Sequence, residues 1–277
     1  IYMEMDTEPT KTGTLQSDKW EEGKRKAKGD NTCVVVGWNA APRSWNVRYG
    51  VSYISVEQAK RNLRREIKGF DLKKVKSAGR KIWNEELGKI SVSGGTENDR
   101  FVFYTSLYRC LERPVNISEE GRYFCVYDNR IHEDGGYAYY TDDWIWDSYR
   151  AAHPLRILTD RKKHTDIIRS FLRMSEFSSD HWFPNFPEVT GDSRRMNCNH
   201  GVSVIADAWY KGVRDFDLQK AYTYTKAAIE EKTLAPWSSA KAGWIDRFYK
   251  EKGYIPSLAS GEQETCLLYT SPSPRDC

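Results

Sequence analysis

The sequence lacks the features that would place it in a membrane or on nucleic acid. No stretch of its 277 residues approaches the roughly 20 consecutive apolar residues that a membrane-spanning helix needs. Its 43 basic and 39 acidic side chains leave a formal net charge of +4, so no sustained basic field predicts a nucleic-acid partner. Aromatic residues make up 13 % of the chain, which argues against disorder. These features predict a globular protein with neither a membrane nor a nucleic-acid partner.

Several common catalytic and metal-binding motifs are also missing. The five histidines show neither H-x-x-x-H nor H-E-x-x-H spacing, so we predict no metal site from them. No two cysteines are spaced as C-x-x-C, which leaves a zinc ribbon or a thioredoxin-type site without support. The nucleophile elbow G-x-S-x-G and a glycine-rich phosphate loop are absent as well. Serine-hydrolase and nucleotide-binding chemistry therefore have no candidate residues.

The last twelve residues, 266–277, resemble the translation of a transposase sequencing adapter, which matches Cys266 to Asp276 residue for residue. A segment of this kind is not part of the natural protein, so it tells nothing about the fold. We therefore expect the natural sequence to end near Thr265 and to be a fragment of a longer protein. A natural Ser/Pro tail is the alternative. Without the tail four cysteines remain, and the sequence cannot choose among their three possible disulfide pairings: Cys33, Cys110, Cys125 and Cys198.

Residues 1–54 have the pattern of a β domain that begins outside this sequence. Two strands are predicted, a buried one at 33–36 and an alternating one at 49–54. The pattern changes at Ser55, where a capping box formed with Gln58 predicts a helix start. We therefore interpret residues 55–97 as linker helices.

From residue 98 to residue 265 the pattern is helix after helix. An apolar stripe formed by Phe101, Tyr104, Tyr108 and Leu111 ends at Pro114. A strand or hairpin arm is predicted at 121–128, and further helices are predicted at 143–158, 160–175, 201–211, 217–231 and 239–252. The whole chain is therefore expected to be mainly α with a small β part, built from antiparallel helical hairpins.

The densest group of chemically active residues runs from 139 to 150. On one helix Asp143 and Asp147 would share a face, and their like charges would need compensation. One interpretation makes Asp143 an N-cap and pairs Asp147 with an arginine, Arg150 or Arg156. The other places Asp147 and Trp146 at a sugar, where a carboxylate accepts from paired hydroxyls and an indole stacks on C–H surfaces.

Two other groups allow both a structural and a functional interpretation. The polar residues 192–200 precede an apolar helix, and they form either an ordinary capping turn or the lining of a pocket. Trp182 and Trp237 belong to aromatic, proline-rich loops, where they either pack inside or stack on sugar rings. The basic run from 60 to 81 flanks apolar helical positions, as expected for a solvated linker face.

Six motifs follow one another along the chain: VSYISVEQA at 51–59, FYTSLYR at 103–109, WDSYRAAHPL at 146–155, MNCNH at 196–200, ADAWYKG at 206–212 and KGYIP at 252–256. Together they resemble glycoside hydrolase family 92, the calcium-dependent exo-acting α-mannosidases. The similarity spans about residues 45 to 265, and the stretch at 146–155 is its most specific part.

The resemblance implies a fold and a reaction. Residues 1–54 would be the C-terminal remnant of an N-terminal β-sandwich, 55–97 the linker helices, and 98–265 the first part of an (α/α)6 catalytic barrel. The implied function is inverting hydrolysis of terminal α-mannosides of glycans, of α-1,2 type, by one carboxylic acid and one carboxylate that activates water. A Ca2+ cofactor would hold the mannose O2 and O3.

The resemblance also assigns the site residues. Trp146 and Asp147 match positions that line the terminal-mannose pocket, while Asn199 and His200 match a loop that more often reads Asp-His. The catalytic acid, the base and the calcium ligands would follow Thr265, so we expect no catalytic residue and no metal ligand in this chain, and no activity from it alone.

Several questions stay open at this stage. The alternatives are a non-catalytic carbohydrate-binding module and a helical scaffold without sugar chemistry. Family members are mostly exported, so a secreted or periplasmic location is expected. The linkage specificity and the oligomeric state do not follow from the sequence. A barrel cut partway would leave apolar helix faces uncovered, for example at Val204, Ile205 and Trp209, and would associate.

Overall fold

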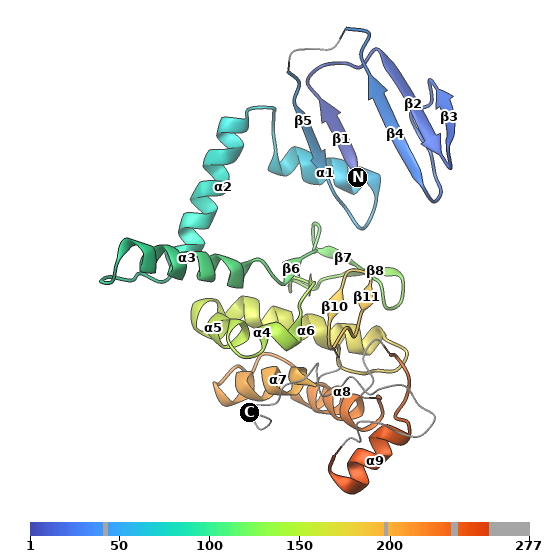
Figure 1. The fold of residues 1–277 in the computed structure, drawn as a ribbon. Helices are drawn as coiled ribbons and strands as arrows, with labels where there is room; N and C mark the ends of the chain where they lie inside the picture. Colours follow the sequence, from blue (N-terminus) through green and yellow to red (C-terminus); the bar gives the residue numbers. More distant parts are fainter. Residues whose placement is uncertain (41–43, 197–198, 234–237, 255–277) are drawn as a thin grey trace. The chain divides into compact units, whose positions relative to one another are not determined.

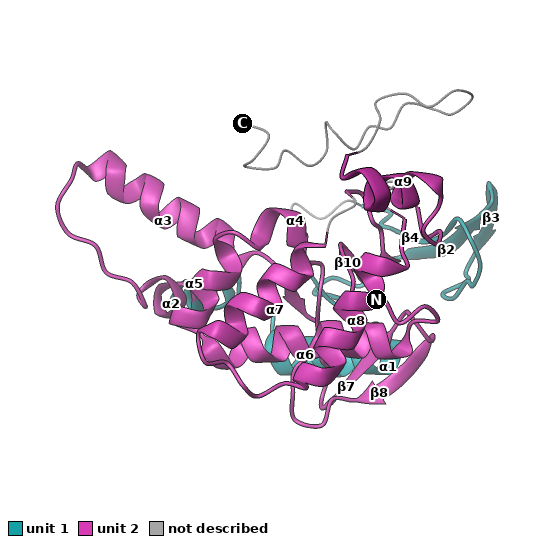
Figure 2. Ribbon diagram, turned by 90° about the horizontal axis from the view of Figure 1, so that it is seen from below, with its two compact units in different colours: residues 1–82 teal, residues 83–277 magenta. Residues whose placement is uncertain are grey.

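The computed structural model describes residues 1–40, 44–196, 199–233 and 238–254. The predictions for Cys198, for Trp237 and for the tail 266–277 lie outside these described residues. The chain separates into two compact units, residues 1–82 and 83–277, shown in different colours in Figure 2. Among the described residues, no helix has both the length and the apolar character that crossing a membrane requires.

The first unit contains two small antiparallel sheets and a helix. One sheet has three strands, with β2 (Lys11–Gln16) between β3 (Lys19–Glu22) and β4 (Thr32–Gly37). The other sheet is a pair, β1 (Tyr2–Met5) with β5 (Val47–Gly50). Helix α1 (Val56–Glu66) packs against β1 and β5 and buries Ala59 and Leu63.

The strand predictions for this unit are correct in place but wrong in burial and length. The strand predicted at 33–36 lies within β4, where Val34 and Val35 are 56 % and 40 % exposed, so it is not a buried strand. The strand predicted at 49–54 ends at Gly50. Its continuation is broken at Ser52, whose hydroxyl accepts the backbone amides of the residues just before α1 and so turns the chain into the helix.

The predicted capping box at the start of α1 forms only in part. The Ser55 hydroxyl accepts the backbone amide of Gln58 at 3.0 Å, as expected for an N-cap. The Gln58 side chain instead donates to Asn62 Oδ1 at 3.1 Å inside the unit. A second helix, α2 (Leu72–Leu87), follows as predicted.

The second unit is built from seven described helices and three small antiparallel strand pairs (Figure 1). The helices are α3 (Glu97–Leu111), α4 (Ile145–Ser148), α5 (Ala152–Thr159), α6 (Arg161–Phe177), α7 (His200–Tyr210), α8 (Leu218–Glu230) and α9 (Trp244–Lys252). The strand pairs are β6 (Val115–Asn116) with β9 (Tyr140–Thr141), β7 (Arg122–Cys125) with β8 (Arg130–Glu133), and β10 (Pro187–Glu188) with β11 (Gly191–Asp192).

Most of these elements match their predictions, including the hairpin at 121–128 and the Asp217 cap, whose side chain accepts the Lys220 amide. The helix predicted at 143–158 is instead two helices, α4 and α5. Pro154 gives the reason, because proline has no backbone N–H and its ring clashes with the carbonyl four residues earlier. It fits only the first turn of a new helix, and α5 begins at Ala152.

Helix α6 lies at the centre of the hydrophobic core of the second unit. Its residues Ile167, Ile168 and Phe171 are fully buried. Helix α6 packs against α5 and α8 (Figure 1) and also against β9. The predicted uncovered face of α7 is wrong for Val204 and Ile205, which are 2 % and 6 % exposed. Helices α5 and α8 both contact α7, and these two side chains belong to the hydrophobic core of the unit.

The apolar stripe on α3 and the aromatic loop also differ from expectation. Phe101 is 70 % exposed, whereas Leu107, outside the predicted stripe, is the buried residue of α3. Trp182 is buried, and its indole Nε1 donates to Glu231 Oε2 at 3.2 Å. The packing interpretation therefore holds for Trp182, which cannot serve as a platform for sugar rings.

Candidate functional site

The four predicted site residues lie on two helices that contact each other. Trp146 and Asp147 are in the single-turn helix α4, while Asn199 occupies the N-cap position of α7 and His200 is the first residue of that helix. Helices α4 and α7 contact each other, although a long stretch of chain separates them. The fold therefore brings together the two motifs that the sequence places far apart.

A ring stack lies between these two segments. The Tyr149 ring, just after α4, stacks on the His200 imidazole with a centroid separation of 3.9 Å and an interplanar angle of 8°. Arg150 Nε donates to the Tyr149 hydroxyl at 2.8 Å. Burial lowers the pKa of His200, and the Arg150 charge lowers it further, so the imidazole is neutral at pH 7.

The predicted site residues differ in how far they are exposed. Asp147 is exposed as a residue, but partial burial of its carboxyl and the nearby Asp143 charge both raise its pKa. Trp146 is half-buried beside it. Asn199 Oδ1 is buried and has no hydrogen-bond partner among the described residues. It borders a small hollow lined also by Phe183 and Asn185.

The predicted roles of Asp143 are wrong. Asp143 precedes α4 rather than lying on it, and the N-cap position belongs to Trp144, which makes no side-chain cap bond. The Asp143 carboxyl is instead buried, with Oδ1 accepting from Ser148 Oγ at 2.8 Å and Oδ2 lying 2.8 Å from His153 Nε2. It cannot share a solvent face with Asp147, which forms no ion pair with another described residue.

A buried polar cluster surrounds this carboxyl. The His153 and His164 rings lie 5.3 Å apart in an edge-on arrangement, on α5 and α6. Burial, assisted by His153 and Arg156, lowers the pKa of His164 from its ordinary value of 6.5 to about 3, so this ring is neutral. Arg156 donates to the backbone carbonyl of Cys110 at 2.9 Å and also to that of Arg113.

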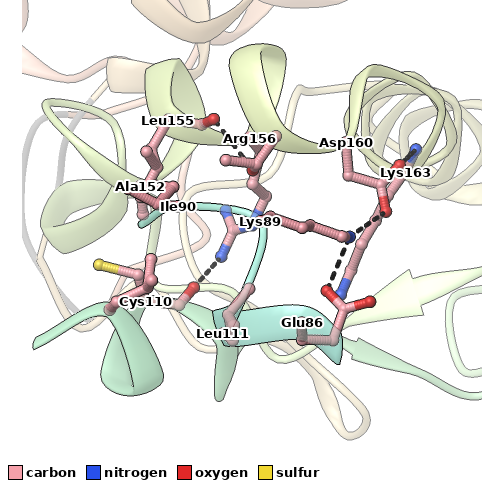
Figure 3. A pocket seen from close by; sticks show the side chains of 12 residues that line it. Glu86, Lys89, Ile90, Cys110, Leu111, Ala152, Leu155, Arg156, Asp160 and Lys163 are labelled. Carbon is pink, nitrogen blue, oxygen red and sulfur yellow. Dashed lines mark hydrogen bonds and ion pairs between the residues drawn. The ribbon is translucent and has the colours of Figure 1, made fainter. Parts of the chain in front are cut away.

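A separate pocket lies at the ends of α2 and α3, against α5 and the start of α6. Figure 3 shows the Lys89 ammonium between two carboxylates, 2.8 Å from Glu86 and 3.7 Å from Asp160. Arg156 also lines this pocket and belongs as well to the buried cluster around Asp143. None of the four predicted site residues lines the pocket, so it is not the predicted sugar site.

The described part of the chain offers no metal site. Within residues 1–40, 44–196, 199–233 and 238–254, no group of three or more histidine, cysteine, aspartate or glutamate side chains is arranged to hold an ion. The cysteines in these ranges, Cys33, Cys110 and Cys125, are free thiols. The described ranges therefore hold no cluster of carboxylates that would fit a calcium ion.

Tyr149 contacts the candidate site residue His200 and Arg150 donates to Tyr149, but the prediction did not include them as site residues. Both belong to the WDSYRAAHPL motif. The aromatic Tyr149, two positions after Asp147, could therefore have been named as a candidate from the sequence. The stack itself could not be foreseen, because nothing in the local sequence indicates that the start of α7 packs on the end of α4.

The class of protein follows from its similarity to a known family. The catalytic domain of glycosyl hydrolase family 92 matches residues 58–268, so the chain belongs to a family of glycoside hydrolases. A relative from Arthroderma benhamiae, described as an uncharacterized secreted glycosidase, is 26 % identical over 223 residues, covering 78 % of this chain and 24 % of that protein.

Two solved structures from Bacteroides thetaiotaomicron have the same fold. An inverting mannosidase of family 92 superposes with a TM-score of 0.79 at 27 % identity and covers 92 % of this chain and 34 % of its own. A family 92 α-mannosidase in complex with mannoimidazole gives a TM-score of 0.73 at 23 % identity, with 92 % and 33 % covered. The chain thus spans about a quarter to a third of the length of these relatives.

Proposed function

We propose that this chain is part of an exo-α-mannosidase in which α4 and the start of α7 form one wall of the pocket for a terminal mannose. The observation that carries the proposal is the Tyr149–His200 stack, which joins the segment of Trp146 and the exposed Asp147 to the start of α7, next to Asn199. Membership of family 92 and the mannosidase names of the structural relatives support the same sugar.

Each residue of this wall has a chemical role in the proposal. The Asp147 carboxylate accepts hydrogen bonds from two adjacent sugar hydroxyls, and charge-assisted bonds of this kind are the strong ones. The Trp146 indole stacks on the C–H face of the ring. The half-buried Asn199 side chain supplies a further polar contact. The neutral His200 ring can donate to or accept from the sugar.

The remaining parts of the reaction belong to the proposal as well. We assign an inverting mechanism and α-1,2 specificity to the whole enzyme. The name of one structural relative, an inverting mannosidase, supports the stereochemistry. The acid, the base and the calcium ligands would come from residues outside the described ones. Residues 1–54 would be the end of a β-sandwich, residues 55–97 linker helices and residues 98–265 the first part of an (α/α)6 barrel, in a secreted or periplasmic enzyme.

Binding can be tested on the chain itself. Methyl α-D-mannopyranoside is added to isotope-labelled protein and followed by NMR, with methyl α-D-glucopyranoside, its epimer at C2, as the control sugar. We expect saturable shifts of the Trp146 indole signal with the mannoside, and a loss of these shifts in Asp147→Asn. Absence of any mannoside-specific shift in the parent chain would contradict the proposed pocket.

Catalysis is tested separately with an aryl α-mannoside, with and without Ca2+. We expect no hydrolysis, because the acid and the base are assigned to residues elsewhere in the whole enzyme. Calcium-dependent turnover by this chain would show that this division of the active site is wrong.

A further inference from the structure

The residues that hold α4 in place are separate from those that face the sugar. Helix α4 is a single turn of four residues without a side-chain N-cap, and so short a helix is unstable by itself. Its position must therefore come from its surroundings. Trp146 and Asp147 depend on that position, because both belong to this turn.

We propose that Asp143 and His153 are positioning residues, which hold α4 so that Trp146 and Asp147 face the sugar. This inference rests on the proposed function and deepens it. Neither side chain touches the sugar in the proposal, since both are 1 % exposed. Their effect on binding is exerted through α4.

Three connections converge on Asp143. Its backbone amide donates to the Pro187 carbonyl on β10 at 3.0 Å. Its Oδ1 accepts from Ser148 Oγ in the last position of α4, and its Oδ2 pairs with His153 Nε2 on α5, both at 2.8 Å. One carboxyl group thus joins the segment before α4, the end of α4 and the next helix.

The charges around this carboxyl favour its ionised form. Burial opposes ionisation, but His153, Arg156 and the Ser148 hydroxyl together lower the pKa of Asp143. His164, which faces His153 from α6, is neutral and adds no charge. A buried carboxylate with partners on several elements is hard to remove, because loss of either side leaves an uncompensated charge or donor.

A second effect of Asp143 is electrostatic. Its negative charge is one of the two causes that raise the pKa of Asp147, burial being the first. The buried carboxyl thus acts on the exposed one through charge as well as through the position of the helix. A residue that merely filled space would show neither effect.

The test compares Asp143→Asn with a matched control, Asp128→Asn. Asp128 pairs with His132 at the same distance of 2.8 Å, but in the β7–β8 hairpin. Three quantities are measured: amide hydrogen exchange in α4 relative to α6, the pKa of the Asp147 carboxyl by carbon NMR, and the dissociation constant for methyl α-D-mannopyranoside.

In Asp143→Asn we expect α4 exchange at least about tenfold faster relative to α6, a lower pKa for Asp147, and at least about tenfold weaker binding. The control variant should leave all three unchanged. Unchanged α4 exchange and an unchanged Asp147 pKa in a folded Asp143→Asn protein would overturn the inference. If the parent chain does not bind the mannoside, the proposed function fails, while these two readouts still judge the positioning role.

Milder variants keep the inference testable if Asp143→Asn does not fold. Ser148→Ala removes one contact of the carboxyl and leaves its pair with His153 intact, so a few-fold increase in α4 exchange is expected. His153→Gln retains a donor for Asp143 and should preserve most of the protection that His153→Leu loses. Equal protection in the two His153 variants would show that the pair does not position α4.

Discussion

Tyr149 and His200 are stacked almost parallel, with ring centroids 3.9 Å apart and 8° between their planes. One ring follows α4 and the other opens α7, so a single aromatic contact joins the two motifs of the candidate site. Because the pKa of His200 is lowered, its ring brings no charge to this contact at pH 7. Its strength should therefore depend on packing rather than on salt.

Removing this stack should weaken the second unit measurably. We expect Tyr149→Leu to lower the free energy of unfolding by about 0.5–1.5 kcal/mol, the range for aromatic pairs beyond their buried area. Chemical denaturation followed by tryptophan fluorescence measures the change. Tyr210→Leu is the control, since Tyr210 is 90 % exposed and should change stability by less than about 0.5 kcal/mol. Equal effects of the two variants would contradict a role for the stack.

The neutral, buried His164 predicts a loss of stability in acid. Its pKa is lowered from 6.5 to about 3, mainly by burial, so the unfolded chain binds a proton in this interval and the folded chain does not. The stabilising contribution is complete above about pH 6.5 and is lost as the pH falls toward 3. The slope is about 1.4 kcal/mol per pH unit.

Protonation of buried carboxylates such as Asp143, whose pKa is lowered, also destabilises the fold in acid. The contribution of His164 is therefore found by comparing the parent protein with a variant that lacks this histidine. His164→Gln keeps a polar group of similar size but does not titrate. Free energies of unfolding of both proteins are measured from pH 7 to pH 4. We expect the difference between parent and variant to change over this range, and a constant difference would show that His164 titrates normally.

Gly201 is a place where even one methyl group should be costly. A Cβ at this position in α7 would lie 2.4 Å from the ring atoms of Phe183, a buried side chain with little freedom to move. We expect Gly201→Ala to destabilise the protein by about 1–3 kcal/mol, as overpacking does. It should also disturb the NMR signals of the adjacent His200.

Gly79→Ala is the matched control for this substitution. Gly79 lies inside α2, and a Cβ there meets no atom within 4 Å. Alanine is the better helix former by up to about 1 kcal/mol, so this variant should be neutral or stabilising. If both alanine variants behaved alike, the contact with Phe183 would not matter.

The buried Lys232 side chain binds Asn185, which lines the same small hollow as Asn199. Its ammonium donates to Asn185 Oδ1 at 2.7 Å, and both side chains are buried. Asn185→Ala should cost about 1.5–3 kcal/mol, the range for a hydrogen bond to a charged group. Thermal unfolding measures the change, and the pair Asn185→Ala with Lys232→Met should recover part of the loss. An additive double variant would contradict the coupling of the two residues.

The sequence predicts most of the helices of the second unit, because their apolar spacing and caps are local signals. Asp217 is an example, since a single side chain and the amide three residues later decide the helix start. The division of 143–158 at Pro154 was equally local and could have been predicted. By contrast, the exposure of Phe101 depends on which other elements lie beside α3, and periodicity alone does not show this.

The site shows the same division between local and long-range information. The motif containing Trp146 and Asp147 is visible in the sequence, and so is the group at 192–200. The inward direction of the Asp143 carboxyl is not visible, because it depends on His153 in the next helix and on Pro187 in a distant strand. Long-range pairing of this kind is what a single sequence lacks.

Gly50 has a consequence for how chains of this kind can vary. At the end of β5 a Cβ would lie 2.2 Å from the backbone carbonyl of Ala59 and 2.9 Å from the Leu63 Cβ, so strand and helix meet backbone to backbone. In a related protein, any larger residue at this position would force α1 to move away from its sheet. Tyr49, next to it, is 59 % exposed, so other residues can replace it during evolution. Two adjacent positions of one strand therefore differ sharply in the substitutions they tolerate.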